Sequence, residues 1–179
     1  MKKYFLYLTF FTSMLFGAVS CEDENDVDLQ GWRVANQQAF NAITNNSQYK
    51  ELKSPGNEGS IYYRVIEKGE GKDSIYYTSM VKCHYIGRYA ADYTEYNIKK
   101  GDIFDQLLHD DGNPFHFNVG TEVIKGWKTA LYNMVKGDKW EVYIPYQLGY
   151  GIKGSKNIPG YSTLVFEMEV VDVTGVDDI

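Results

Sequence analysis

Aromatic side chains are the residues of this sequence best suited to form a site. The chain has 16 Tyr, 9 Phe and 3 Trp among its 179 residues. The rings at the ends of predicted segments or on their inward faces are Tyr85, Phe104, Phe115, Phe117, Trp127, Tyr150, Tyr161 and Phe166. Rings in such numbers usually fill a hydrophobic core. A pocket lined with them also excludes water, and can act on an uncharged group without acids, bases or metals.

The motifs of common hydrolases, phosphate sites and zinc sites are absent from the sequence. It contains no Walker loop, no Cys-x-x-Cys pair, no His-Glu-x-x-His and no Gly-x-Ser-x-Gly. His84, His109 and His116 lie on predicted strand exteriors or in a loop, without metal-ligand spacing, so we expect no metal site. Cys21 and Cys83 are too few for a disulfide framework. Cys83 lies in the apolar alternation of a predicted strand, which indicates a buried core residue rather than a nucleophile.

Length and composition predict one soluble domain with a short appendage. A chain of 179 residues and 20.5 kDa has room for one principal core. Hydrophobic residues make up 44% and charged residues 23%, which is close to the globular average. The formal net charge of -6 and the pI near 5.1 exclude a phosphate-binding surface, so nucleic acid is not an expected partner. The 17 Gly and the many aromatic residues favour an α+β or all-β fold.

The N-terminus is typical of a secretory signal peptide. Lys2 and Lys3 form a basic start, and the uncharged apolar run at residues 4–16 is shorter than the roughly 20 residues of a spanning helix. Residues 18–21 (AVSC) resemble a bacterial lipobox, which predicts removal of residues 1–20 and lipidation of Cys21. The alternative is an ordinary signal peptide that leaves Cys21 unmodified. We therefore expect a lipid-anchored protein of the cell envelope, on the periplasmic or the exposed side of the outer membrane.

One amphipathic helix is predicted over residues 28–49. Its apolar residues recur at three- and four-residue spacing and are Trp32, Ala35, Ala39, Phe40 and Ile43. The helix either packs against its own domain or serves as an arm for homodimerisation. Residues 54–57 (SPGN) then interrupt the pattern and indicate a linker.

The remaining pattern predicts a curved antiparallel sheet that covers one short helix. Strands are expected at residues 61–66, 78–86, 138–145 and 162–173, and a helix capped by Thr121 at residues 122–135. Together these segments indicate an α+β fold. The predicted divisions are a signal peptide at 1–20, an acidic tether and helix at 21–57, the main domain at 58–175 and an acidic tail at 176–179.

Six local strings in a fixed order connect the chain to a known family. They are residues 81–87 (VKCHYIG), 104–105 (FD), 114–120 (PFHFNVG), 122–127 (EVIKGW), 144–151 (IPYQLGYG) and 158–170 (IPGYSTLVFEMEV). In these strings the chain resembles the FKBP-type peptidyl-prolyl cis-trans isomerases over roughly residues 60–173. The resemblance implies a half-barrel of antiparallel sheet wrapped around a short helix, here with an N-terminal helical extension.

The resemblance also implies the residues of the site. Trp127 is expected to form the floor of a pocket, and its walls are expected to be Tyr85, Phe104, Phe115, Val123, Ile124, Ile158 and Phe166. Tyr150 is expected to donate a hydrogen bond to a ligand carbonyl, and Asp105 to be the carboxylate at the rim. The residues expected to take part in catalysis are Asp105, Tyr150, Phe166 and Tyr85.

Three segments depart from the family pattern. Residues 88–103 replace a shorter hairpin, and residues 106–113 lack the Arg that commonly pairs with the rim carboxylate. The loop at residues 152–157 is shortened and ends in the polar Asn157.

The activity implied is rotation about X-Pro bonds in exported polypeptides. That rotation costs about 18–20 kcal/mol because the twisted amide loses its resonance. A twisted amide is less charge-separated than a planar one, so a desolvated pocket favours it without a covalent intermediate or a cofactor. The alternatives are a non-catalytic module or holdase that binds proline-containing segments, and a structural envelope lipoprotein that binds no peptide.

Overall fold

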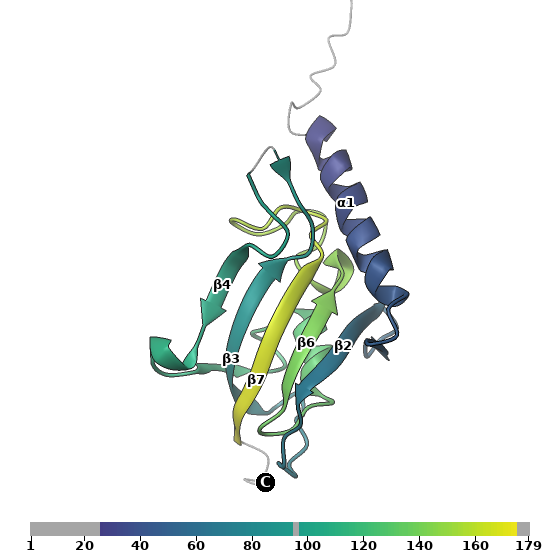
Figure 1. Cartoon of the computed structure of the whole chain (residues 1–179). Coiled ribbons are helices and arrows are strands. Elements are labelled where there is room, and N and C mark those ends of the chain that lie inside the picture. Colours follow the sequence, from purple (N-terminus) through teal and green to yellow (C-terminus); the bar gives the residue numbers. More distant parts are fainter. Residues whose placement is uncertain (1–25, 95–96, 175–179) are drawn as a thin grey trace, which may run out of the picture.

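The computed structural model describes residues 26–94 and 97–174 (Figure 1). The predicted signal peptide, Cys21 and the acidic tail lie outside the described residues. The elements follow one another as α1 (Asp26–Thr44), β1 (Lys50–Lys53), β2 (Ser60–Glu67), β3 (Met80–Tyr89), β4 (Ile103–Leu107), η2 (His109–Asp111), β5 (Phe115–Asn118), α2 (Lys125–Leu131), β6 (Lys139–Ile144), η3 (Tyr146–Leu148) and β7 (Leu164–Thr174).

The strands form one antiparallel seven-stranded sheet, which confirms the predicted α+β class. Its order is β1-β2-β6-β7-β3-β4, and β5 also pairs with β3 (Figure 1). One edge of β3 pairs with β7 along its whole length. The other edge is divided between β5, opposite residues 80–83, and β4, opposite residues 85–88. This division brings aromatic residues from two separate segments to the same side of β3.

Alternation along β7 places its core residues on one face, as predicted, but in β3 the prediction that His84 lies on the strand exterior is wrong, because His84 is only 6% exposed. In β7 the residues Leu164, Phe166, Met168 and Val170 are buried, while their neighbours are partly exposed. The short helix α2 packs closely against β6 at Gly126, where an added Cβ would lie only 2.4 Å from the Ile144 side chain.

The prediction that the short helix runs over residues 122–135 with Thr121 as its cap is wrong. The helix α2 is confined to Lys125–Leu131, and its N-cap is Ile124, without a side-chain hydrogen bond. The Thr121 hydroxyl instead donates to Asn118 Oδ1 at 3.1 Å. Asn118 Oδ1 also accepts from the Gly120 amide at 3.0 Å, so the polar residues before α2 stabilise a tight turn and do not extend the helix.

Helix α1 packs against its own domain, as the first of the two alternatives predicts. Trp32 is 1% exposed, and its ring lies 4.7 Å from that of Tyr93 and 6.2 Å from that of Tyr89. Asn36 is buried, and its Oδ1 accepts from the Thr163 amide at 2.6 Å. The helix therefore connects the ends of β3 and β7. A role as a dimerisation arm stays a prediction.

The N-terminal boundary of the sheet precedes the predicted linker. Helix α1 ends at Thr44 rather than at residue 49, and just beyond its last turn the Asn45 side-chain Nδ2 donates to the Asn41 backbone carbonyl at 2.9 Å. The chain then enters β1, which pairs with β2. The sheet thus begins at Lys50, before the predicted start of the main domain at residue 58. No helix of the described residues has the length and apolar character to cross a bilayer.

Candidate functional site

An aromatic cavity of about 340 Å³ lies between α2 and strands β3, β4, β5 and β7. Of the ten predicted site residues, the ones that line it are Tyr85, Asp105, Phe115, Val123, Ile124, Trp127, Tyr150 and Phe166. Thr121 and Glu122 line it as well, although we did not predict them as site residues. The available signal was that both residues lie directly before Val123, which we did predict as a site residue.

Trp127 lies at the centre of the ring contacts. Its ring meets that of Phe166 at 5.3 Å and 89°, and that of Tyr85 at 5.2 Å and 81°. The Phe117 ring is fully buried, and its centroid lies 5.6 Å from that of Trp127. Edge-to-face contacts of this kind are the favoured geometry for aromatic pairs. The Trp127 ring is thereby held in one orientation as a rigid apolar surface.

Strand register explains why the rings converge. Gly87 pairs with Phe166 of β7 on one side and with Asp105 of β4 on the other. A Cβ at Gly87 would lie 2.6 Å from Phe104 Cζ and 2.9 Å from Phe166 Cε1. The absence of a side chain at Gly87 lets these two rings approach each other across β3, with their centroids 5.6 Å apart.

Two tyrosine hydroxyls and one carboxylate supply the polar groups at the rim. The Tyr85 hydroxyl donates to Asp105 Oδ2 at 2.8 Å. Burial and this bond to Asp105 raise the pKa of Tyr85 far above its ordinary value. Burial and the charge of Asp105 also raise the pKa of Tyr150. Both hydroxyls therefore stay protonated and able to donate at neutral and mildly alkaline pH.

The other two predicted site residues, Phe104 and Ile158, line a neighbouring cavity of about 380 Å³. This second cavity shares Asp105 and Tyr150 with the aromatic cavity. The Phe104 ring nevertheless contacts the Phe166 ring, so it supports the aromatic cavity from its outer side.

The described part of the long segment at residues 88–103 does not line the aromatic cavity. Tyr89, Ala90, Ala91 and Tyr93 are buried, and Tyr93 forms an isolated bridge with Ile98. Tyr93 contacts Trp32 of α1, so the described part of the segment folds back onto the N-terminal helix.

Cys83 is fully buried in β3, which confirms the prediction of a core residue. Burial raises the pKa of its thiol well above the ordinary value, so the reactive thiolate is disfavoured. Among the described residues, no group of three or more His, Cys, Asp or Glu side chains could hold a metal ion.

Comparison with known families gives a match over most of the main domain. The family model described as FKBP-type peptidyl-prolyl cis-trans isomerase matches residues 71–171.

The chain matches two curated relatives over different shares of their lengths. FK506-binding protein 2 of Emericella nidulans is 36% identical over 136 residues, which are 75% of this chain and 87% of that protein. The FKBP-type 22 kDa peptidyl-prolyl cis-trans isomerase of Escherichia coli is 38% identical over 117 residues, or 65% of this chain. The chain spans only about half, 51%, of the E. coli protein.

Solved structures show the same architecture. A peptidyl-prolyl cis-trans isomerase from Pseudomonas syringae pv. tomato is 28% identical to the chain, with a TM-score of 0.64. The match covers 82% of this chain and 96% of that one, so it includes more than the sheet and α2 alone.

Proposed function

This chain belongs to the FKBP-type peptidyl-prolyl cis-trans isomerases, and we propose that it accelerates rotation about X-Pro bonds in exported polypeptides. The observation that carries the proposal is the cavity that brings Trp127, Phe166 and Tyr85 together with Tyr150 and Asp105. Uncatalysed isomerisation takes roughly 10–100 s at 25 °C, which is slow enough to limit the folding of a secreted chain.

The proposed mechanism is desolvation of the amide in an apolar pocket. The proline ring packs on Trp127 and against the Phe166 ring, where water is excluded. Because the twisted amide is less charge-separated than the planar one, this environment favours the transition state over the ground state. The neutral Tyr150 hydroxyl donates to a substrate carbonyl and fixes the orientation of the bond. The Tyr85 hydroxyl donates to Asp105 and holds it at the rim, where residues 106–113 supply no Arg.

Kinetics on short peptides with Leu-Pro and Phe-Pro bonds test the proposal. We expect the purified protein to accelerate isomerisation and Asp105→Ala to reduce it. Tyr150→Phe removes one neutral hydrogen bond of about 0.5–1.5 kcal/mol, which corresponds to a loss of about two- to tenfold in kcat/KM. Tyr76→Phe is the matched control because Tyr76 is 56% exposed and lies outside the cavity. Its kcat/KM should equal that of the wild type.

Two outcomes would contradict the proposal in different ways. A folded protein that binds the peptides without accelerating their isomerisation would be a proline-peptide binding module or holdase. A folded protein that neither binds nor accelerates would support a structural role in the envelope. A change in Trp127 fluorescence on peptide addition separates these two results.

We further propose that the protein is exported and attached to a membrane by a lipid on Cys21. The support is the basic start, the apolar run and residues 18–21 (AVSC) of the sequence. Intact mass of the protein from the membrane fraction should show acyl chains on a mature N-terminal Cys21. Cys21→Ser should lose these chains and move the protein to the soluble fraction. An unmodified thiol on the wild-type Cys21 would favour the ordinary signal peptide instead.

A further inference from the structure

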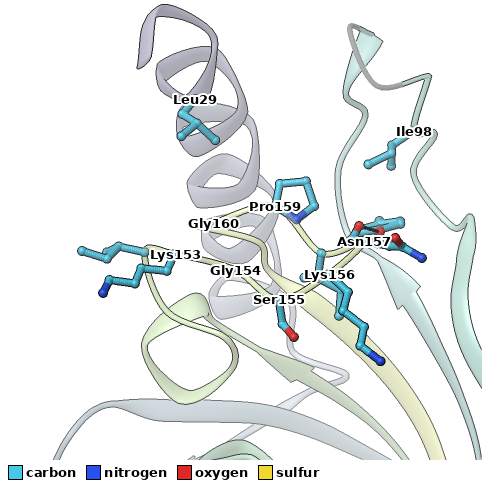
Figure 2. Close-up of a pocket in the computed structure, with 12 residues that line it drawn as sticks. Leu29, Ile98, Lys153, Gly154, Ser155, Lys156, Asn157, Pro159 and Gly160 are labelled. Carbon is cyan, nitrogen blue, oxygen red and sulfur yellow. Dashed lines mark hydrogen bonds between the residues drawn. The ribbon is translucent and has the colours of Figure 1, made fainter. Parts of the chain in front are cut away.

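A larger cavity, of about 730 Å³, lies beside the loop at residues 152–160 (Figure 2). Its walls are Leu29 of α1 on one side and Tyr89 and Ile98 on the other, and residues 152–160 complete the lining. Figure 2 shows Leu29 on α1 and Ile98 on the segment across from it, with Pro159 between them in this view. We call this cavity the loop groove. It is built from α1 and the long segment at residues 88–103, both of which lie outside the strings that connect the chain to its family.

The loop groove and the aromatic cavity share no lining residue, but both border a third cavity between them. The loop groove shares Ser155, Lys156, Asn157 and Ile158 with this third cavity, the neighbouring cavity of about 380 Å³. That neighbouring cavity shares Asp105 and Tyr150 with the aromatic cavity. A polypeptide with its proline on Trp127 can therefore extend over Asp105 and Tyr150 toward the loop groove.

The loop that lines the groove is held in its conformation by backbone hydrogen bonds and close backbone packing. Ser155 and Ile158 exchange two backbone hydrogen bonds, at 2.9 and 2.7 Å. A Cβ at Gly154 would lie 2.1 Å from the Ile158 carbonyl oxygen, and one at Gly160 would lie 2.0 Å from that of Ile152. The Tyr89 hydroxyl also donates to the Asn157 carbonyl at 2.6 Å. A preformed surface of this kind reduces the entropic cost of binding.

The chemistry of the lining combines apolar walls with positive charge. Leu29 and Ile98 are partly exposed, and Ile152 is 58% exposed. Lys153 and Lys156 are the charged residues of the lining, and no Asp or Glu lies among the lining residues that the structure describes. The charged side chains of the groove lining are therefore positive, although the formal net charge of the protein is -6.

We propose that the loop groove is an extended subsite for the client polypeptide, and that it selects an apolar residue next to an acidic one in the segment flanking the proline. The inference rests on the proposed function because the same client occupies both sites. The third cavity, which borders both the loop groove and the aromatic cavity, favours a client segment over a second copy of this chain. The apolar side chain contacts Ile152 together with Leu29 and Ile98, and the acidic residue pairs with Lys153 or Lys156.

Isomerisation kinetics of the full-length protein on two peptide sets test this subsite. The first set consists of short Leu-Pro peptides, which reach only the aromatic cavity. The second set carries a Leu-Glu pair two to five residues from the proline, on either side. Partial burial of one apolar side chain should lower KM by about five- to tenfold for the best extended peptide, with little change in kcat. Replacing its Glu with Lys should remove about two- to fivefold of this gain, as expected for an exposed ion pair.

Variants of the groove separate a client subsite from a structural effect. Ile152→Ser should remove most of the KM advantage of the extended peptide, and Lys153→Glu should reverse the preference between Glu and Lys. Both should leave kcat/KM on the short peptides unchanged. The matched controls are Val34→Ser and Lys68→Glu. Val34 lies on α1 and is 56% exposed, and Lys68 is the first residue after β2. Neither control should change either peptide set.

Three results would overturn the inference. Equal KM values of the wild type for short and extended peptides would show that the groove does not bind clients, although the isomerase activity would stand. Concentration-dependent dimerisation that Ile152→Ser abolishes, without any peptide preference, would assign the groove to a second copy. If short peptides are not turned over, the proposed function fails. Fluorescence polarisation of labelled extended peptides on wild type and Ile152→Ser then still decides the groove, and equal affinities would exclude it.

Discussion

Gly87→Ala is expected to remove most of the isomerase activity while the protein remains folded. The added methyl group would lie 2.6 Å from Phe104 Cζ and 2.9 Å from Phe166 Cε1, closer than carbon atoms can approach. Phe166 is 3% exposed and contacts Trp127, so its ring cannot move without displacing the pocket floor. Overpacking of this kind destabilises a core by about 1–3 kcal/mol. A displacement of about 1 Å in a catalytic site can lower the rate about a hundredfold.

Denaturant unfolding and peptide kinetics on the same preparation measure the two effects of Gly87→Ala. We expect kcat/KM to fall more than tenfold under conditions where the variant is still fully folded. Loss of stability cannot account for such a decrease, because no unfolded protein is present. The matched control is Gly31→Ala, because Gly31 lies in α1 with no atom within 4 Å of an added Cβ. That control should gain about 0.5–1 kcal/mol in helix stability and keep its activity. Wild-type kinetics in Gly87→Ala would mean that the spacing of the Phe104 and Phe166 rings does not define the pocket.

The rings and the polar rim residues of the aromatic cavity could be predicted because each lies in a local string, whereas the hydrogen bond between Tyr85 and Asp105 could not. Trp127 and Phe166 are identified by residues next to them in the sequence. The partner of Asp105 is different, because Tyr85 lies 20 residues away and reaches it only through the β3–β4 register. Sequence reasoning indicated that residues 106–113 lack the usual Arg, but it could not show that the Tyr85 hydroxyl donates to Asp105.

The role of the N-terminal helix was also only half predictable. Spacing of apolar residues shows that α1 has one buried face, but it does not show what covers that face. The cover includes Tyr89 and Tyr93, which belong to the segment where the chain departs from the family pattern. Helix α1 and the segment at residues 88–103 thus stabilise each other. The same pairing forms opposite walls of the loop groove.

Trp32→Ala is expected to have the largest effect on stability of any substitution in α1. Trp32 is 1% exposed, and its ring contacts those of Tyr89 and Tyr93. Replacing a buried Trp by Ala costs about 3–5 kcal/mol because the cavity left behind does not fully collapse. For a domain of this size each kcal/mol lowers Tm by about 2–4 °C. Calorimetry should therefore show a loss of well over 5 °C, while Val34→Ala on the exposed face of the same helix should change Tm very little.

Activity measurements on Trp32→Ala show how far the helix supports the site. The Tyr89 ring that Trp32 supports lies 5.2 Å from Phe104, and its hydroxyl donates to Asn157 of the loop. Below the Tm of the variant, short peptides that use only the aromatic cavity should be turned over at close to the wild-type rate. Extended peptides should lose their lower KM, because Tyr89 lines the loop groove. A variant as stable as the wild type would instead mean that α1 is not part of the domain core, and would restore the dimerisation arm as its role.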